Sequence, residues 1–554
     1  MMRLNAFGFL KSTGPRADRF FDLRNPLFVF PALKLLLHAV TWAGYGVFRD
    51  ELYYLACADR PAAGYVDHPP LSIWLLAAVR AVFGEALWAL RAPAALAGAA
   101  AVFLVGLTAK RLGAGVWGQS VAMVAMLSVP VFWFTGHIYS MNAFEPLIWC
   151  LVAYLWLGRE TVSDQAPDAP DDKPAVPPWG LLGLVLGLGL LNKISVLWLG
   201  AGLAVALIAT PDRRLLRTPG PWLCGALSFL LFSPFLVWQG LRGWPMAEFI
   251  GNATSSKMQS VSAWQFILKQ VDMLGAPTAM AMALGFGALA AAGGRRRSLA
   301  LIYGTIFLIL LLNGSSRASY LAPAYTFLAA GFGAACETWM RRLQSRPILR
   351  PTSRWATSRW ATLRWAIPGV LAAHGLVALP FALPILPVPT YLAYAEGLGV
   401  EAGTEERKEI GLLPQHYADM FGWQEKVEAA RRVFDGLSPA DQAVACLAAQ
   451  NYGVAGALEA ERLFPSSEPD VPLPPVLSGH NNYWLWLPPG CSGEVLIVLG
   501  DDRETLEAAF ASVEAVDKVD CELCMPYEDD QTVWLVRNPL LSIEEIWPQV
   551  KNFS

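Results

Sequence analysis

Charge is scarce in this sequence: Asp, Glu, Lys and Arg together make up 16% of its 554 residues, whereas 55% are hydrophobic. The chain also lacks a Gly-rich nucleotide-binding loop, a Ser-based nucleophile elbow and a zinc-protease helix, which excludes the sites that those motifs mark. A soluble chain of this length would form several domains, but repeated apolar runs of spanning length argue against that class. The composition predicts a polytopic α-helical membrane protein.

Eleven apolar segments are predicted to span the membrane. Asn192-Lys193 interrupts the apolar run between two of them, which indicates two short helices that meet at one membrane face. The segments lie near residues 27–48, 87–109, 116–135, 141–158, 179–191, 194–210, 220–239, 272–292, 299–313, 319–337 and 366–386.

The basic residues predict the orientation. With eleven spans, the Arg-containing N-terminal tail and every strong basic cluster fall on one side, whereas the acidic loop 49–68 falls on the other. Because cytoplasmic loops are rich in Lys and Arg, we expect a bacterial inner-membrane protein with a cytoplasmic N-terminus and a periplasmic C-terminus. The tail shows no small-residue cleavage site, so no removable signal peptide is expected. The basic clusters are topology signals, so no nucleic-acid partner is expected.

The predicted domains are a cytoplasmic tail (1–26), a transmembrane catalytic domain (27–386) and a periplasmic α/β domain (387–554). In the last domain we expect strands at 494–500 and 532–537, a helix at 501–516, and a strand or helix at 443–449.

Four cysteines lie in the C-terminal segment, and an oxidising compartment would allow three different pairings among them. Cys521-x-x-Cys524 could mark a metal or redox site, but without a second spaced pair the buried or disulfide-bonded interpretation is favoured. The four are Cys446, Cys491, Cys521 and Cys524.

The first outer loop concentrates six ionisable groups between apolar segments. Asp50-Glu51 offers a general base towards a hydroxyl or amine, with a solvated loop or the cap of a helix at 52–58 as an equal alternative. Asp67-His68 precedes two prolines and a predicted interfacial helix at 71–83, where it could bind a divalent metal ion or a phosphate. Helix capping by Asp67 and simple packing of His68 are the favoured alternatives.

Three more charged residues are predicted near the outer face. Glu145 lies inside an apolar segment, which makes it a functional candidate by default. Lys193 and Arg317 could hold a lipid-linked phosphate beside the acidic loop. The alternative for both cations is that they extend towards the lipid headgroups.

Together these motifs resemble bacterial GT-C glycosyltransferases that use polyprenyl-phosphate-linked sugars. The nearest groups are the dolichyl-phosphate-mannose:protein mannosyltransferase-like proteins and the aminoarabinose:lipid A transferases. The resemblance covers nearly the whole chain and rests on the order and spacing of short motifs. These include 49–54, 64–70, 140–147, 189–193, 320–325, 413–423 and 478–486.

The resemblance implies an inverting transferase that moves a sugar from a polyprenyl phosphate to a lipid, glycan or protein acceptor. It implies that Asp50 is the catalytic base with Glu51 as support, and that Glu145 carries the second acidic motif. Asp67 and His68 match a loop near donor phosphate or metal, and Lys193 matches a phosphate-contacting lysine. Arg317 and Tyr320 stand nearest a Lys and a Tyr of a family pattern that is altered here.

Two other classes remain open. A transporter also has broken spans and embedded charges, although the charges here gather at the outer face and no internal repeat is visible. A non-catalytic sensor or scaffold is weaker, and it would tolerate loss of Asp50 and Glu145 together.

Overall fold

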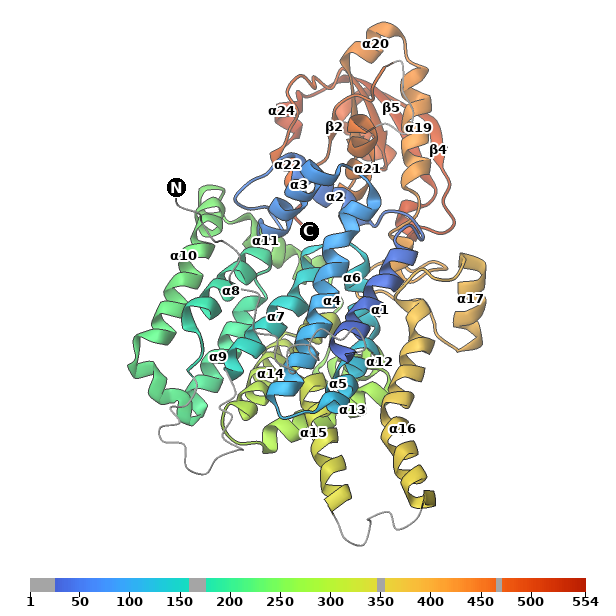
Figure 1. Ribbon diagram of the computed structural model, residues 1–554. Coiled ribbons are helices and arrows are strands. Elements are labelled where there is room, and N and C mark those ends of the chain that lie inside the picture. The colour runs from blue at the N-terminus through green and yellow to red at the C-terminus, as the bar shows by residue number, and fades with distance from the viewer. Residues whose placement is uncertain (1–24, 159–175, 346–353, 465–470) are drawn as a thin grey trace, which may run out of the picture.

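The computed structural model describes residues 25–158, 176–345, 354–464 and 471–554. A bundle of helices is followed by a five-stranded sheet with flanking helices, which lies at one end of the bundle (Figure 1). Helices α15 (Ala322–Ser345) and α16 (Arg354–Ala378) extend towards the opposite end, away from the sheet.

Within the described residues, four helices are long and apolar enough to cross a membrane. They comprise α4 (Leu87–Arg111), α10 (Pro219–Leu241), α14 (Gly294–Asn313) and the stretch Arg364–Phe381. Three bent pairs raise the number to as many as seven by length and composition. The pairs are α5 (Val116–Leu127) with α6 (Pro130–His137), α9 (Val196–Ala209) with η1 (Pro211–Arg217), and α12 (Ala263–Leu274) with α13 (Ala276–Ala291).

Each of the eleven predicted spans overlaps at least one helix, although the first helix ends earlier than expected, at Thr41. The arrangement fits a multi-pass membrane protein, and the count of eleven stays a prediction. Shorter apolar helices account for three more predicted ranges: α1 (Pro26–Thr41), α7 (Met141–Leu157) and α8 (Trp179–Asn192). The remaining range, 319–337, falls on α15.

Two helices follow the first span at the sheet end of the bundle. Helix α2 (Arg49–Asp59) extends the predicted range 52–58 by a few residues, and α3 (Leu71–Phe83) has the predicted bounds. Val82 and Phe83 on α3 are 72% and 57% exposed, as an interfacial helix requires.

Glycine allows close contacts between helices in the bundle. An added Cβ at Gly333 on α15 would lie 2.3 Å from the carbonyl oxygen of Gly118 on α5. Small residues let helix backbones approach in this way inside a membrane, where packing rather than the hydrophobic effect holds helices together.

The sheet has the strand order β2-β1-β3-β5-β4. Strand β1 pairs in parallel with β2 and β3, whereas β5 is antiparallel to both β3 and β4. The strands are β1 (Ala445–Ala449), β2 (Val476–Leu477), β3 (Val495–Leu499), β4 (Phe510–Val519) and β5 (Gln531–Pro539).

The predicted strands at 494–500 and 532–537 correspond to β3 and β5, and the ambiguous segment 443–449 is mainly strand β1. The predicted helix at 501–516 is wrong over its second half, because α23 (Arg503–Ala509) ends where β4 begins. Residues such as Glu514 and Ala515 favour helix locally, but pairing with β5 overrides that preference.

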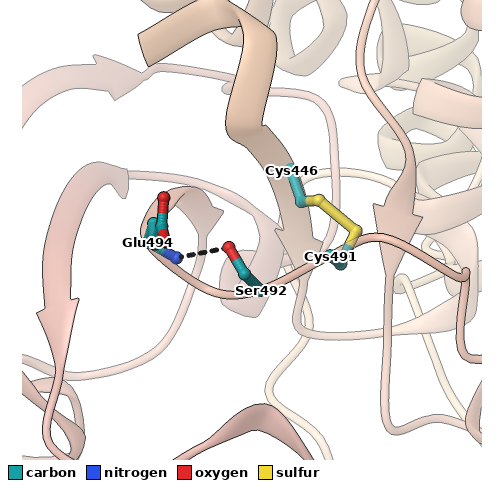
Figure 2. The surroundings of a disulfide bond; sticks show 4 residues. All are labelled: Cys446, Cys491, Ser492 and Glu494. Atoms are coloured by element: carbon teal, nitrogen blue, oxygen red, sulfur yellow. Dashed lines mark hydrogen bonds between the residues drawn. A yellow bond between two sulfur atoms is a disulfide. The ribbon is translucent and has the colours of Figure 1, made fainter. Parts of the chain in front are cut away.

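A disulfide joins Cys446 of β1 to Cys491 in the loop before β3 (Figure 2). In that loop, the Ser492 hydroxyl accepts a hydrogen bond from the Glu494 N–H. Of the four cysteines of this segment, two are therefore disulfide-bonded, whereas Cys521 and Cys524 are buried free thiols.

The sheet-bearing part packs directly on the charged segment 49–68 through contacts between α21 (Tyr452–Leu463) and α2. An added Cβ at Gly453 would lie 2.6 Å from the Arg49 side chain, and one at Gly456 would lie 2.9 Å from the Leu52 backbone. Two glycines one helical turn apart thus bring α21 against α2, beside Asp50.

Candidate active site

Helix α2 begins at the acidic pair. The Glu51 carboxylate accepts a hydrogen bond from the Phe48 N–H at 2.9 Å, which satisfies a donor at the start of the helix. Acidic side chains in the first turn also face the positive end of the helix dipole. The N-terminal turn therefore accommodates both carboxylates, but it directs them differently.

Glu51 is fully buried, and both of its carboxylate oxygens accept hydrogen bonds. Its Oε1 accepts from Arg91 Nε and from the Tyr139 N–H, both at 2.9 Å. Its Oε2 accepts from Arg91 Nη2 at 2.6 Å in addition to the Phe48 N–H. This pairing ties α2 to α4 and occupies both oxygens of the Glu51 carboxylate, so the supporting role of Glu51 stays a prediction.

Asp50 points the other way, and its side chain is 33% exposed. Its Oδ1 accepts a hydrogen bond of 2.9 Å from the Tyr452 hydroxyl on α21 and lies 4.0 Å from Arg49 Nε. The second oxygen accepts no hydrogen bond from the described residues. Asp50 therefore has the accessibility that a general base needs.

Arg49 is anchored from three directions beside Asp50. Its Nη1 donates to the Tyr527 hydroxyl at 2.5 Å and lies 3.4 Å from the Asp419 carboxylate, while its guanidinium stacks over the Tyr452 ring. Burial raises the pKa of Asp419 to about 7, although Arg49 opposes that rise. These contacts hold the start of α2 against the sheet-bearing part.

Asp67 and His68 lie close to Asp50. The Tyr53 hydroxyl donates to Asp67 Oδ1 at 2.9 Å, and His68 Nε2 is 3.8 Å from the same oxygen. His68 is fully buried, and its Nε2 has no hydrogen-bond partner among the described residues. Burial raises the pKa of Asp67, while His68 and Tyr53 counteract that rise and Asp50 adds to it.

Two tyrosines whose rings contact each other connect the two acidic positions. The rings of Tyr53 and Tyr452 are 4.9 Å apart, and each hydroxyl holds one aspartate. Asn482 Nδ2 donates to the Tyr53 hydroxyl at 2.7 Å. The structure thus brings Asp50 and Asp67 into one polar cluster, completed by residues from the sheet-bearing part.

Glu145 and Lys193 form a second cluster near the N-terminal end of α7. Lys193 Nζ donates to Glu145 Oε2 and to Asn142 Oδ1, both at 2.7 Å, and it lies 5.2 Å from the Tyr320 ring centre. The Ser195 hydroxyl donates to the other Glu145 oxygen. The predicted site residues Glu145, Lys193 and Tyr320 therefore meet, and Lys193 is ion-paired with Glu145.

Arg317 belongs to a third cluster, in which its Nη2 donates to Glu406 Oε1 at 2.6 Å. Burial alone would raise the pKa of Glu406, but Lys257, Arg49 and Arg317 together lower it to about 2. Burial lowers the pKa of Lys257, and the nearby Glu406 opposes that effect. Arg49 lowers the pKa of Lys257 further, whereas Asp50 opposes that effect.

Several residues of these clusters are absent from the sequence-based prediction. Lys257 and Glu406 carry no motif that separates them from other surface charges. Tyr452 and Asn482 act on α2 from more than 400 positions away in the chain. Asp419 and Asn482 lie in the segments 413–423 and 478–486, which resemble the family. That resemblance was the sequence signal that could have pointed to these two residues.

Asp67 and His68 supply two potential metal ligands. Among the described residues, no group of three or more His, Cys, Asp or Glu side chains is arranged to hold a metal ion. The divalent metal stays a prediction, and no step below is routed through one.

Comparison with known proteins gives one family match. The model for dolichyl-phosphate-mannose-protein mannosyltransferase matches residues 67–238, a range that includes Asp67, His68, Glu145 and Lys193. A search of curated proteins gave no significant match.

Two solved structures resemble the fold over almost their whole length. ArnT from Cupriavidus metallidurans bound to undecaprenyl phosphate has a TM-score of 0.56 at 16% identity, covering 92% of this chain and 97% of that one. The apo form has a TM-score of 0.55 at 15% identity with the same coverage. The predicted resemblance is confirmed, and the chain has a GT-C-like fold with a C-terminal sheet domain.

Proposed function

We propose that this protein is an inverting glycosyltransferase that takes a sugar from a polyprenyl phosphate on the outer face of the bacterial inner membrane. The observation that carries the proposal is the difference between its carboxylates. Glu51, Glu145 and Glu406 each accept a hydrogen bond of 2.6 or 2.7 Å from a cation, whereas Asp50 is 33% exposed and lies 4.0 Å from Arg49 Nε. The ArnT structure, which was solved with undecaprenyl phosphate, supports the donor class.

In the proposed reaction, Asp50 removes the proton from an acceptor hydroxyl or amine. The acceptor atom then forms a bond to the anomeric carbon from the face opposite the phosphate. The bond between that carbon and the phosphate oxygen breaks, and its electron pair leaves with the polyprenyl phosphate. One displacement inverts the configuration, so no covalent enzyme intermediate is required.

The departing phosphate needs cations that retain free donors. A lysine ammonium has three N–H donors, and Lys193 uses two of them on Glu145 and Asn142. Arg317 Nε has no hydrogen-bond partner among the described residues, and Lys257 forms no ion pair within 4.0 Å there. We assign leaving-group stabilisation to these three cations, with Glu145 and Tyr320 orienting Lys193.

Asp67 and His68 are proposed to contact the donor on the other side of Asp50. His68 offers a buried ring nitrogen without a partner, and Asp67 is kept in place by Tyr53. The proposed orientation puts residues 1–26 in the cytoplasm, the transmembrane catalytic domain at 27–386 and the periplasmic domain at 387–554. The proposal covers hexosyl and pentosyl donors and lipid, glycan or protein acceptors alike.

A reconstituted assay tests this function. Purified protein in liposomes is supplied with a radiolabelled polyprenyl-phosphate sugar and an envelope glycolipid extract, and release of label from the carrier is measured. Asp50→Asn is expected to abolish release while donor binding and protein yield persist. Asp59→Asn is the matched control, because Asp59 lies on the same helix but pairs with Arg80 at 2.9 Å.

Unchanged turnover by Asp50→Asn would refute Asp50 as the base. Movement of intact solute across the liposome membrane, without release of sugar from the carrier, would instead support the transporter alternative. Equal loss of activity in Asp50→Asn and Asp59→Asn would show that α2 is merely structurally sensitive.

A further inference from the structure

A pair of thiols lies outside the candidate site, between β4 and β5. Cys524 Sγ donates a hydrogen bond of 2.8 Å to the Cys521 carbonyl oxygen. Both side chains are buried, at 7% and 3% exposure, but Asp520 and Glu522 on either side of Cys521 are exposed. The pair therefore sits just below the surface.

The Cys521 sulfur faces the start of helix α19 (Trp423–Asp435). An added Cβ at Gly422 would lie 2.9 Å from Cys521 Sγ, 3.2 Å from Lys426 Nζ and 3.3 Å from Cys524 Cβ. A helix N-terminus and a neighbouring ammonium both favour a thiolate over a thiol. Consistently, the hydrogen bond from Cys524 and the charge of Lys426 lower the pKa of Cys521, whereas the pKa of Cys524 is raised.

The surroundings favour redox chemistry over metal binding. No third His, Cys, Asp or Glu ligand joins the two cysteines in the described part of the chain. The Cys446–Cys491 disulfide of the same domain indicates an oxidising compartment, in which a neighbouring thiol pair meets disulfide-bearing partners.

We propose that Cys521 and Cys524 form a redox-active pair that passes two electrons to the disulfide of a partner molecule, here called the disulfide donor. Cys521 is the attacking nucleophile. The Cys521 thiolate attacks one sulfur of the donor and releases the other sulfur as a thiolate, which leaves a mixed disulfide. Cys524 then loses its proton to solvent and attacks the Cys521 sulfur. A Cys521–Cys524 disulfide forms, the second donor thiolate leaves, and the donor is reduced by two electrons.

Exchange with glutathione tests the pair in the full-length protein. Purified protein in detergent is equilibrated with mixtures of reduced and oxidised glutathione, quenched with an alkylating reagent and digested for mass spectrometry. The segment carrying Cys521 and Cys524 is expected to lose two hydrogens in oxidising mixtures and to regain them in reducing ones. With limiting reagent at neutral pH, Cys521 should be alkylated about tenfold faster than Cys524.

Two serine variants separate the roles. Cys524→Ser is expected to accumulate a glutathione adduct on Cys521, because no second thiol resolves it, whereas Cys521→Ser leaves Cys524 unmodified. Cys336→Ser, which removes a buried thiol of α15, is the matched control and should leave the exchange unchanged. A dithiol at every glutathione ratio in the wild-type protein, or equal adducts on both variants, would overturn the proposal.

Discussion

The Tyr452 hydroxyl is the contact through which the C-terminal domain acts on the proposed base. Tyr452→Phe removes its hydrogen bond of 2.9 Å to Asp50 and leaves the ring in contact with Tyr53. A hydrogen bond to a charged group contributes about 1.5–3 kcal/mol. Because Asp50 is 33% exposed, water replaces part of that bond, so we take about 1.4 kcal/mol, which corresponds to about tenfold in rate.

The assay is steady-state transfer in liposomes with saturating and limiting donor. Tyr452→Phe is expected to lower kcat about tenfold with KM nearly unchanged, since the bond orients the base rather than the donor. Tyr483→Phe is the control, because its hydroxyl donates to a different carboxylate, Glu459, at 2.9 Å. A wild-type kcat in Tyr452→Phe, or the same loss in Tyr483→Phe, would refute this role for Tyr452.

Two further predictions concern buried carboxylates. Glu51→Gln leaves Arg91 buried without its counter-charge, which costs about 3–5 kcal/mol, so folded yield in detergent should collapse, whereas Asp50→Asn should fold normally. Burial raises the pKa of Asp419 from 3.8 to about 7, so its stabilising contribution is complete below pH 3.8 and lost as pH rises towards about 7. The melting temperature of the wild type relative to Asp419→Asn should fall across that window, and a constant difference would contradict the assignment.

The helices of the bundle were predictable because each depends on its own apolar run. Lipid-facing segments must satisfy their backbone hydrogen bonds internally, so their sequence alone predicts a helix. Strands β3 and β5 were predictable because each is a short apolar run bounded by turn residues, whereas the run at 443–449 left strand and helix both open. The segment 510–516 was not, because its strand conformation depends on hydrogen bonds to β5 from later in the chain.

The candidate site was predictable in outline only. The motifs around Asp50, Asp67, Glu145 and Lys193 indicated which loops to consider, and the structure brings Asp50 near Asp67 and Lys193 onto Glu145. Lys257 was missed because it lies in no recognisable pattern, and its relevance comes from its charged neighbours.

By itself, the sequence determined that this chain is a helical membrane protein with a charged segment at 49–68 and a GT-C resemblance. Composition and contiguous apolar runs are enough for the first two conclusions, whereas the resemblance rests on the order and spacing of short motifs along the chain. Only the tertiary structure decided that Glu51 is neutralised by Arg91 while Asp50 stays accessible, that Tyr452 reaches Asp50, and that Cys446 pairs with Cys491. Ion pairs, hydrogen bonds and disulfides join side chains that meet in space, and no local pattern records which ones meet.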